Sequence, residues 1–495
     1  MSARFAVRSE RVASWGAALV PAGAGLGAQW LLHIAVPEAP FAPFSVGEWI
    51  IRHTPGGLAT MAIDVLGRWA LRLLAALTIA GALFGGVVLR RVRPVFLGAT
   101  ALAASLGGAA LDPGRPAIEH SLAAGLVAAG AATLAAGAIG SEPRGAASVN
   151  LGRRRFLAGL VAGVGMLALG SGALWRAFRA AVPARFEATR PLGVQTDPAF
   201  DRIGGLSPLV TPREDHYVVD VDLVDPIVAA SGWRLTVGGQ MGPAFALSLG
   251  DLLDMPTVER LVCMSCISNP VGGALVSDST WTGVPVKDVL GRAGLSGGAA
   301  TLVARGADGY FETIPLDAAT LPFTLVAVAM DGALLPREHG YPARLLVPGH
   351  YGYKSVKWLQ SLSVVPGRAQ GYWVRRGWDP AGVIRTESRF DVPSDHAQVP
   401  ARFMAAGVAW AGDRGISRVE VSSDDRRRWT RAELERPGDP LAWRRWRLPM
   451  TLRPGIHALT VRATDGTGAI QSATYLPPHP SGASGYHRIV VSVMG

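Results

Sequence analysis

The chain has 495 residues, enough for several domains, and 49% of them are hydrophobic. Its net charge of +11 is unevenly spread: residues 1–182 contain 16 arginines and 7 acidic residues, whereas the rest contains 32 basic and 30 acidic side chains. The positive charge therefore accompanies the hydrophobic segments, where it sets membrane orientation, and we expect no nucleic-acid partner.

Long uncharged runs fill the N-terminal third of the chain. Most of them approach the roughly 20 residues that a helix needs to span a bilayer. We therefore expect an α-helical transmembrane bundle over residues 1–178, with about five membrane helices and membrane lipid as a partner. The runs are Val12–Val36, Leu73–Leu89, Pro94–Leu111, Ser121–Gly140 and Phe156–Trp175.

Arginine clusters set the orientation of these spans. They precede the first span, separate the second from the third, and precede the fifth: Arg4, Arg8, Arg11; Arg90, Arg91, Arg93; and Arg144, Arg153, Arg154, Arg155. With five spans all three clusters face the cytoplasm, so the chain after Trp175 is expected on the extracytoplasmic side of the cell membrane. The string Arg153-Arg154-Arg155-Phe156-Leu157 is either a twin-arginine export signal or a plain positive-inside anchor.

Residues 179–210 read as a linker with Pro, Arg and Gly and no steady period. From 211 to 368, strand-like runs alternate with the helix-like pieces Leu247–Asp254 and Val286–Ala293, which predicts a mixed α+β domain. The strand-like runs are Tyr217–Val221, Trp233–Val237, Leu302–Ala304, Leu345–Val347 and Leu362–Val365.

Residues 369–495 lack the helical pattern. Runs of alternating apolar and polar residues are separated by turn signals such as Asp465-Gly466, which predicts a β-sandwich of immunoglobulin type. The runs are Ile416–Val421, Trp446–Leu448, His457–Ala463 and Ile489–Val493.

The two cysteines, Cys263 and Cys266, are three residues apart and precede Asn-Pro and paired glycines. Such a pair can form a redox disulfide or half of a zinc site, but no second Cys/His cluster accompanies it. Thiolate is the soft ligand that transition metals favour, and a disulfide would consume it. We expect Cys266 to bind a metal and Cys263 to be a small buried strand residue.

Lysine usage marks a second segment. The chain has 45 arginines and three lysines, of which Lys354 and Lys357 share the stretch 349–358. A compact ammonium group reaches a phosphate or a metal-bound oxygen, so we do not expect these two lysines to be ordinary surface residues. Just upstream, His339 and Arg344 flank a turn whose glycines allow close approach to an anion. The segment suits a phosphorylated cofactor, which an arginine can bind bidentately.

These blocks resemble the sulfite oxidase family of molybdopterin-dependent oxidoreductases. Residues 266–273 with Trp281-Thr282-Gly283-Val284 resemble the first family signature, and 330–344 with 355–359 resemble the second. Residues 407–410, 416–421 and 462–466 resemble the family's dimerisation domain. The resemblance implies a sulfite-oxidase-type molybdopterin domain, a molybdenum–molybdopterin cofactor (a pyranopterin dithiolene), and a homodimer formed through the C-terminal domain.

Carried over residue by residue, the resemblance assigns roles to the candidate site. Cys266 would be the molybdenum thiolate, Tyr310 would line the substrate pocket, and Lys357 would join them as a catalytic residue. The remaining cofactor-binding positions are Asp308, His339, Arg344, Ser355, Val356, Lys357 and, in an early segment, Asp215, His216 and Tyr217. In that early segment the family's Arg-Asn-His string, with its anion-binding arginine, is replaced by Arg213-Glu214-Asp215-His216.

The implied activity is oxygen-atom transfer on the outer face of the membrane, with a cytochrome or a quinone as electron partner. The substrate is a small oxyanion such as sulfite, or, in the reverse direction, a sulfoxide or another oxide. An alternative of another class is a non-catalytic membrane-anchored binding or assembly protein. We do not expect haem, because His33, His53 and His120 do not form a pair at matched depth on facing spans.

Overall fold

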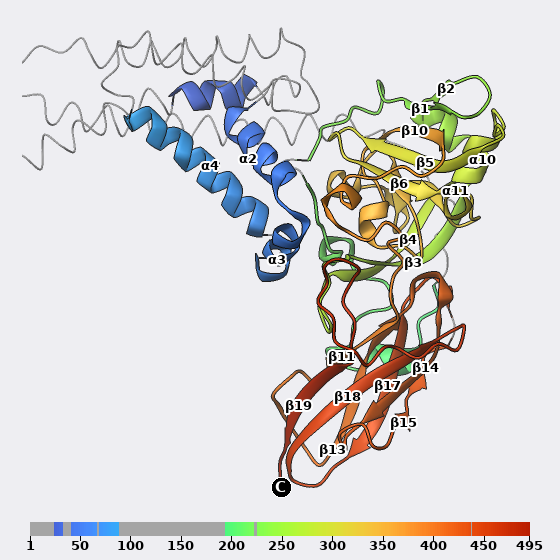
Figure 1. Ribbon diagram of the computed structural model, residues 1–495. Helices are drawn as coiled ribbons and strands as arrows, with labels where there is room; N and C mark the ends of the chain where they lie inside the picture. Colours follow the sequence, from blue (N-terminus) through green and yellow to red (C-terminus); the bar gives the residue numbers. More distant parts are fainter. Residues whose placement is uncertain (1–23, 33–40, 67–68, 89–193, 222–224, 437) are drawn as a thin grey trace, which may run out of the picture. The chain divides into compact units, whose positions relative to one another are not determined.

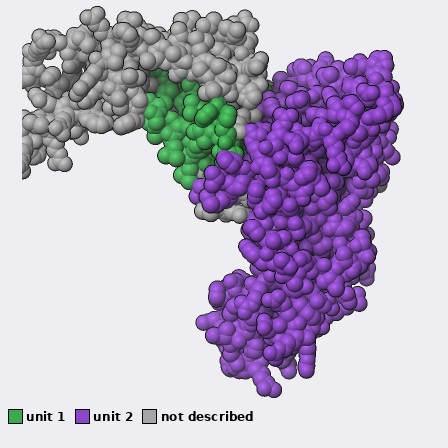
Figure 2. All heavy atoms as spheres, in the orientation of Figure 1, with its two compact units in different colours: residues 1–54, 68–183, 220–227 green, residues 55–67, 184–219, 228–495 purple. Residues whose placement is uncertain are grey.

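The computed structural model describes residues 24–32, 41–66, 69–88, 194–221, 225–436 and 438–495 (Figure 1). The chain divides into two compact units (Figure 2). The first comprises residues 1–54, 68–183 and 220–227, and the second comprises residues 55–67, 184–219 and 228–495.

In the first unit, α2 (Ala42–His53) packs against α4 (Trp69–Val88). Leu73 and Leu77 of α4 are exposed. The predicted spans Pro94–Leu111, Ser121–Gly140 and Phe156–Trp175 lie outside the described residues, as does part of Val12–Val36. None of the helices in the described ranges combines the length and the apolar character needed to cross a membrane.

The central part of the second unit contains two sheets. In the first, β1 pairs in parallel with β10 and all other neighbours are antiparallel, in the order β2-β1-β10-β5-β6. The second has the order β3-β4-β7-β8, with β9 paired to β7. The first sheet comprises β1 (Leu235–Gly239), β2 (Phe245–Leu247), β5 (Ala299–Gly306), β6 (Phe311–Pro315) and β10 (Leu359–Pro366). The second comprises β3 (Val258–Ser265), β4 (Val276–Pro285), β7 (Leu325–Met330), β8 (Ala333–Leu334) and β9 (Arg344–Leu346).

Short helices connect these strands, as the sequence predicts. The helix α9 (Leu249–Leu253) begins at Ser248, whose hydroxyl accepts from the backbone of Asp251 while the Asp251 carboxylate accepts from the backbone of Ser248. This reciprocal capping satisfies two backbone donors at the helix start. The helix α10 (Val286–Gly291) follows Pro285 at the end of β4, and α11 (Leu316–Ala319) follows β6; α3 (Gly56–Leu66) and α8 (Pro198–Asp201) precede β1 in the chain. The expected mixed α+β domain is confirmed.

One expected strand is wrong. Residues 217–221 form no strand, although three of these five residues are valines, which favour strands. The backbone N–H of Tyr217 donates to the Ser277 hydroxyl of β4 at 3.1 Å, and upstream Thr211 N–H donates to the Asp278 carbonyl. The segment is therefore tied to β4 at single points, partly through a side chain, and no strand ladder forms.

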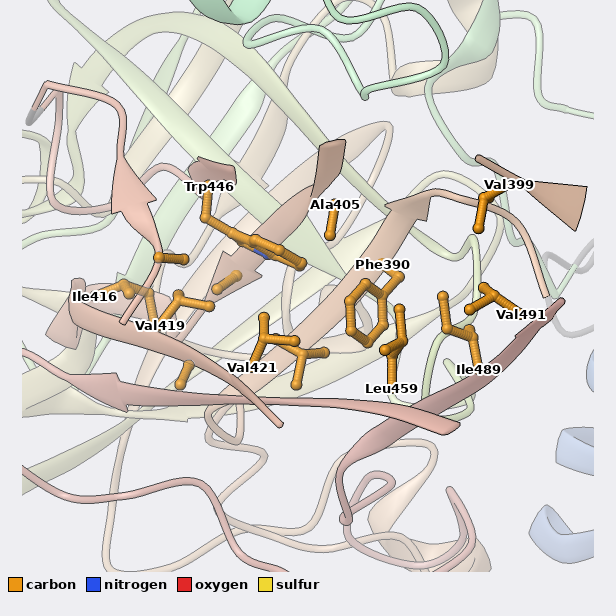
Figure 3. Close-up of a cluster of buried hydrophobic side chains, with 14 of the residues drawn as sticks. Phe390, Val399, Ala405, Ile416, Val419, Val421, Trp446, Leu459, Ile489 and Val491 are labelled. Atoms are coloured by element: carbon orange, nitrogen blue, oxygen red, sulfur yellow. The ribbon is translucent and has the colours of Figure 1, made fainter. Parts of the chain in front are cut away.

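The C-terminal part of the second unit is β-rich and has two sheets, in the orders β11-β13-β17-β16 and β12-β19-β18-β14-β15. Buried side chains from both sheets meet in one hydrophobic core around Phe390, Trp446 and Leu459 (Figure 3). All four predicted C-terminal runs lie in strands of these sheets; their immunoglobulin-type arrangement stays a prediction. The strands are β11 (Glu387–Val392), β12 (Ala397–Val399), β13 (Arg402–Trp410), β14 (Ile416–Ser422), β15 (Thr430–Arg431), β16 (Glu433–Leu434), β17 (Arg444–Thr451), β18 (Gly455–Asp465) and β19 (His487–Val493).

Candidate functional site

Cys266 lies directly after β3, at the start of a closed turn. The second half of β3 is completely buried, and Cys266 itself is 6% exposed. The turn closes because Cys266 N–H donates to the Leu275 carbonyl at 2.9 Å and the Asn269 side chain accepts from Leu275 N–H at 2.9 Å. The Asn-Pro sequence and the glycines that follow thus present one thiol on a fixed loop.

Cys263 lies inside β3, opposite Asp278 of β4. Cys263 and Cys266 form no disulfide. Burial raises the pKa of the Cys263 thiol well above its usual value. Within the described ranges, no three His, Cys, Asp or Glu side chains are grouped so that they could hold a metal ion. Cys263 is therefore the small buried strand residue that the sequence predicts.

Two buried histidines lie together near this loop. His216 follows η2 (Arg213–Asp215), His339 ends η3 (Arg337–His339), and their ring centroids are 4.9 Å apart. Burial lowers the pKa of His216 to about 3 and that of His339 to about 2, and the nearby Arg344 contributes to both shifts. Both imidazoles are therefore neutral at physiological pH.

Tyr217 connects this histidine pair with the cysteine loop. Its ring stacks on His216, with centroids 5.3 Å apart, and its hydroxyl lies against Gly352, close to the Ser265 backbone. Burial raises the pKa of Tyr217; Cys266 raises it further and Arg344 lowers it, which places the three side chains in one neighbourhood.

Arg344 and Lys357 supply positive charge beside the histidines. Arg344 is buried in β9, where its two Nη atoms donate to the carbonyls of His339 and Ser355 at 3.2 and 3.3 Å. Its guanidinium lies 5.0 Å from the centre of the Trp281 ring. Lys357 is half-buried, and its Nζ donates to the Glu338 carbonyl at 2.8 Å. The two cations thus hold the backbone on either side of His339.

Gly340 allows this close arrangement. Its φ of +103° lies in the left-handed region, which favours glycine. A Cβ atom at this position would lie 3.0 Å from the Lys357 Cβ and 3.1 Å from the Arg344 Cβ. The glycine in the predicted turn therefore brings the two cations together.

Ser355, Val356 and Asp308 complete the predicted cofactor segment. The Ser355 hydroxyl accepts from Val347 N–H at 3.1 Å, and the Val356 carbonyl accepts from Leu345 N–H at 2.8 Å, so β9 fixes both residues. The Asp308 carboxylate accepts from Tyr310 N–H at 3.0 Å. The same carboxylate and the Lys357 carbonyl both lie against Gly306, so Asp308 is close to the segment.

Tyr310 belongs to a neighbouring buried cluster. Its hydroxyl donates to the Tyr353 carbonyl at 2.6 Å, in the turn η4 (Gly352–Lys354). In the same cluster, Lys354 and Glu312 form an ion pair at 3.1 Å, and both side chains are 0% exposed. Lys354 is therefore not a surface lysine, as the sequence indicates, but its partner is a carboxylate of the protein.

Two further outcomes concern the early segment and Glu312. Asp215 is exposed at the end of η2, so the structure does not bring it into the buried group with His216. Arg213 is also engaged elsewhere, because its guanidinium donates to the carbonyls of Met330 and Asp331. Sequence reasoning missed Glu312; its signal was an acidic residue in the otherwise uncharged strand β6.

Buried polar atoms show whether these residues suit a polar cofactor. Nε2 of His216, Nε2 of His339 and the Tyr217 hydroxyl are all buried without a hydrogen-bond partner in the described part of the chain. Buried polar groups are normally satisfied, so each unsatisfied one has room for a partner such as a water or a ligand. Together with a buried thiol and two cations, this donor set fits molybdopterin: a thiolate for the metal, neutral hydrogen-bonding rings, and positive charge for a phosphate.

Comparison with known proteins defines the class. Residues 222–373 match the family of the oxidoreductase molybdopterin binding domain, and residues 382–493 match the Mo-co oxidoreductase dimerisation domain. Together with the site, these matches define a molybdopterin-dependent oxidoreductase that uses a molybdenum cofactor.

Individual relatives make the family specific. The chain is 30% identical to the sulfite oxidase of Gallus gallus over 319 residues, which cover 54% of this chain and 69% of that protein. It is 32% identical to the mitochondrial sulfite oxidase of Homo sapiens over 290 residues, 49% of this chain and 53% of that protein. The chain belongs to the sulfite oxidase family. It spans about half the length of the primate relatives that it matches.

A more distant relative and a solved structure complete the comparison. The chain is 30% identical, over 152 residues, to a candidate protein-methionine-sulfoxide reductase subunit of Azospira oryzae, covering 31% of this chain and 56% of that protein. The sulfane dehydrogenase SoxCD of Paracoccus pantotrophus superposes with a TM-score of 0.52 at 21% identity, over 62% of this chain and 90% of that chain. At this identity the superposition shows a shared fold.

Proposed function

We propose that the chain performs oxygen-atom transfer on a small sulfur oxyanion such as sulfite, with Cys266 as the molybdenum ligand. The observation that carries this proposal is a thiol on a closed turn in the neighbourhood of Tyr217 and Arg344, next to two neutral histidines with unsatisfied Nε2 atoms. When bound, the molybdenum cofactor supplies the two-electron oxygen-transfer chemistry. The protein binds and orients it.

The surrounding residues have separate tasks in this proposal. Buried polar atoms of His216, His339 and Tyr217 donate hydrogen bonds to the pterin or accept them from it. In a buried site an unsatisfied polar atom is costly, so these hydrogen bonds make binding specific. Arg344, Lys357 and the segment 355–357 provide the positive side that a phosphate needs. Asp308 bonds the pterin from β5's end, and Tyr310 lines the substrate pocket with its hydroxyl held by the Tyr353 carbonyl.

A second candidate is reduction of a sulfoxide or another neutral oxide with the same cofactor. It is favoured by Arg213, whose Nη2 donates to the Met330 and Asp331 carbonyls, so that this group binds the protein backbone. The relative from Azospira oryzae is consistent with this candidate. Parallel assays with sulfite and methionine sulfoxide, using artificial redox dyes, decide between the two.

The test of the proposed function is a pair of cysteine variants. Cys266→Ser should abolish turnover and lower the molybdenum content, whereas Cys263→Ser should largely spare both, because Cys263 is a strand residue facing Asp278. Equal loss in both variants would point to a dithiol mechanism. Purified wild-type protein without molybdenum would favour the non-catalytic binding or assembly protein.

We also propose that the chain is a multi-pass protein of the cell membrane with its catalytic domain on the extracytoplasmic side. The support is the series of long apolar runs with arginine clusters at alternate ends. The proposed electron partner is a cytochrome or a quinone, and the dimerisation-domain match supports a homodimer. Protease added to spheroplasts should remove a C-terminal tag and spare an N-terminal one; the reverse result would contradict the orientation.

A further inference from the structure

The loop that carries Cys266 is held from behind by the C-terminal β-domain. Arg389, in the first strand of that domain (β11), donates from Nη1 to the Gly273 carbonyl at 2.6 Å. Gly273 is the last glycine of the turn that begins at Cys266. A side chain of one domain thus reaches the end of the other domain's metal-binding loop.

The guanidinium of Arg389 is fixed by two further bonds. Its Nε donates to the Asp391 carboxylate at 2.7 Å, and its Nη2 donates to the Ser207 hydroxyl at 3.0 Å. Asp391 in turn accepts from Ser207 N–H at 3.0 Å, which closes a ring of three residues. The side chains of Arg389 and Asp391 are 12% and 7% exposed. The planar fork of an arginine suits this task, because it holds several acceptors in one fixed geometry.

His487 forms a second contact with the same turn. Its ring lies against Gly272, whose φ is +77°, so that a side chain at position 272 would collide with Nε2 of His487. Its Nδ1 accepts from Phe390 N–H at 3.0 Å, which fixes the ring to the strand that carries Arg389. Burial and Arg389 lower the pKa of His487, so the ring is neutral. Residues of two strands therefore contact the two glycines: His487 of β19 lies against Gly272, and Arg389 of β11 binds the Gly273 carbonyl.

We propose that Arg389 is a positioning residue, which holds the loop 266–273 so that the Cys266 thiolate is fixed before the cofactor binds. This inference rests on the proposed role of Cys266 as metal ligand. Residues that orient a metal ligand from behind typically change metal affinity or activity by about 10- to 100-fold when they are replaced. Asp391 pairs with the guanidinium, and Arg389 acts on Cys266 through its hydrogen bond to the loop.

Arg414 provides a matched control in the same domain. It also pairs with a carboxylate (Asp465, 2.9 Å), a backbone carbonyl (Ile384, 2.9 Å) and a hydroxyl (Thr386, 3.3 Å). Its partners lie outside the loop 266–273. Replacing either arginine by Met therefore removes hydrogen bonds to the same three kinds of acceptor. Only Arg389→Met removes a hydrogen bond to the cysteine loop.

The experiment measures the rate at which iodoacetamide alkylates Cys266 and Cys263 in the full chain, produced in a host that does not make molybdopterin. Mass spectrometry reads the two thiols separately. Arg389→Met should raise the Cys266 rate by about two- to tenfold, since the loss of its one hydrogen bond to the loop changes an opening equilibrium by about that factor. The Cys263 rate should stay within about twofold, and Arg414→Met should change neither rate. In protein loaded in a competent host, Arg389→Met should retain about tenfold less molybdenum.

The other outcomes overturn the proposal. These are an unchanged Cys266 rate in Arg389→Met, a parallel rise at both cysteines, or the same effect in Arg414→Met. If Arg389→Met does not fold, Ser207→Ala removes one bond of the ring and should accelerate Cys266 alkylation by about two- to tenfold. The result is independent of the proposed function: if Cys266 is not the ligand, alkylation still responds to Arg389→Met, whereas Cys266→Ser leaves the molybdenum content unchanged.

Discussion

The buried ion pair between Lys354 and Glu312 allows the sharpest prediction about stability. Lys354 Nζ lies 3.1 Å from a Glu312 oxygen and donates to the Thr313 carbonyl at 2.9 Å, and neither side chain is exposed. The same carboxylate accepts from Thr313 N–H at 3.0 Å. Burial raises the pKa of Glu312, and the ammonium of Lys354 lowers it. Lys354→Met removes the largest contribution that favours the charged carboxylate.

The expected loss of stability in Lys354→Met follows from the unpaired charge that remains on Glu312. Breaking a buried pair by removing one partner typically costs about 3–5 kcal/mol, because the remaining charge has no compensation. Without Lys354 the folded-state pKa of Glu312 rises further above its unfolded value. The stability of the variant is therefore greatest below the unfolded pKa and is lost as the pH rises. We expect a deficit of about 3–5 kcal/mol at pH 8 and a clearly smaller one at pH 5.

Guanidinium unfolding of the full chain at pH 5 and pH 8 measures these differences. The double variant Lys354→Met/Glu312→Gln should recover most of the loss, because no charge remains buried. Lys287→Met is the control: Lys287 is exposed on α10, so its replacement should change stability by less than about 0.5 kcal/mol. The reasoning is refuted if Lys354→Met costs less than about 1 kcal/mol at pH 8, or costs the same at both pH values.

Two further predictions concern buried titratable groups. Burial raises the pKa of Glu387 to about 8, so stability is lost between the unfolded value of 4.5 and about pH 8. Glu387→Gln should remove a pH-dependent difference on the order of 5 kcal/mol, and an unchanged stability profile would contradict this. His216 and His339 are held neutral, with pKa values of about 3 and 2, so their stabilisation is present above pH 6.5 and is lost on acidification. His339→Phe should make the stability fall less steeply below pH 6.5, and an equally steep fall in the variant would refute it.

Much of the fold follows from local sequence patterns. The alternating runs in the C-terminal part lie in β14, β17, β18 and β19, because each has one face toward a shared hydrophobic core. The run Tyr217–Val221 contains three valines, which favour strands, but it forms no strand. Residue types and alternation do not report whether a ladder partner is available. The membrane domain over residues 1–178 stays a prediction.

Some residues of the site can also be predicted from short sequence motifs, and others cannot. Cys266, His339 and Arg344 lie in short motifs whose residue types already indicate metal and anion binding, and the structure places Arg344 against the His339 carbonyl. Asp215 lies apart from this group, because one residue step around a tight 3₁₀ turn separates its exposed side chain from the buried His216.

Other contacts of the site have no local signal. Arg389 reaches the Gly273 carbonyl across 116 positions of sequence, and its target is a backbone atom. The composition of a loop does not reveal which distant side chain its carbonyls accept from. The ion pair of Glu312 is also not visible in the local sequence, because its partner Lys354 lies 42 positions away.

The central claim is that the Cys266 sulfur binds molybdenum. X-ray absorption at the molybdenum edge of purified, loaded protein tests it most directly, because the method counts the sulfur atoms around the metal. The number of molybdenum–sulfur contacts should be one lower in Cys266→Ser than in the wild type, with Cys263→Ser unchanged. An identical sulfur count in the wild type and in loaded Cys266→Ser would contradict the claim.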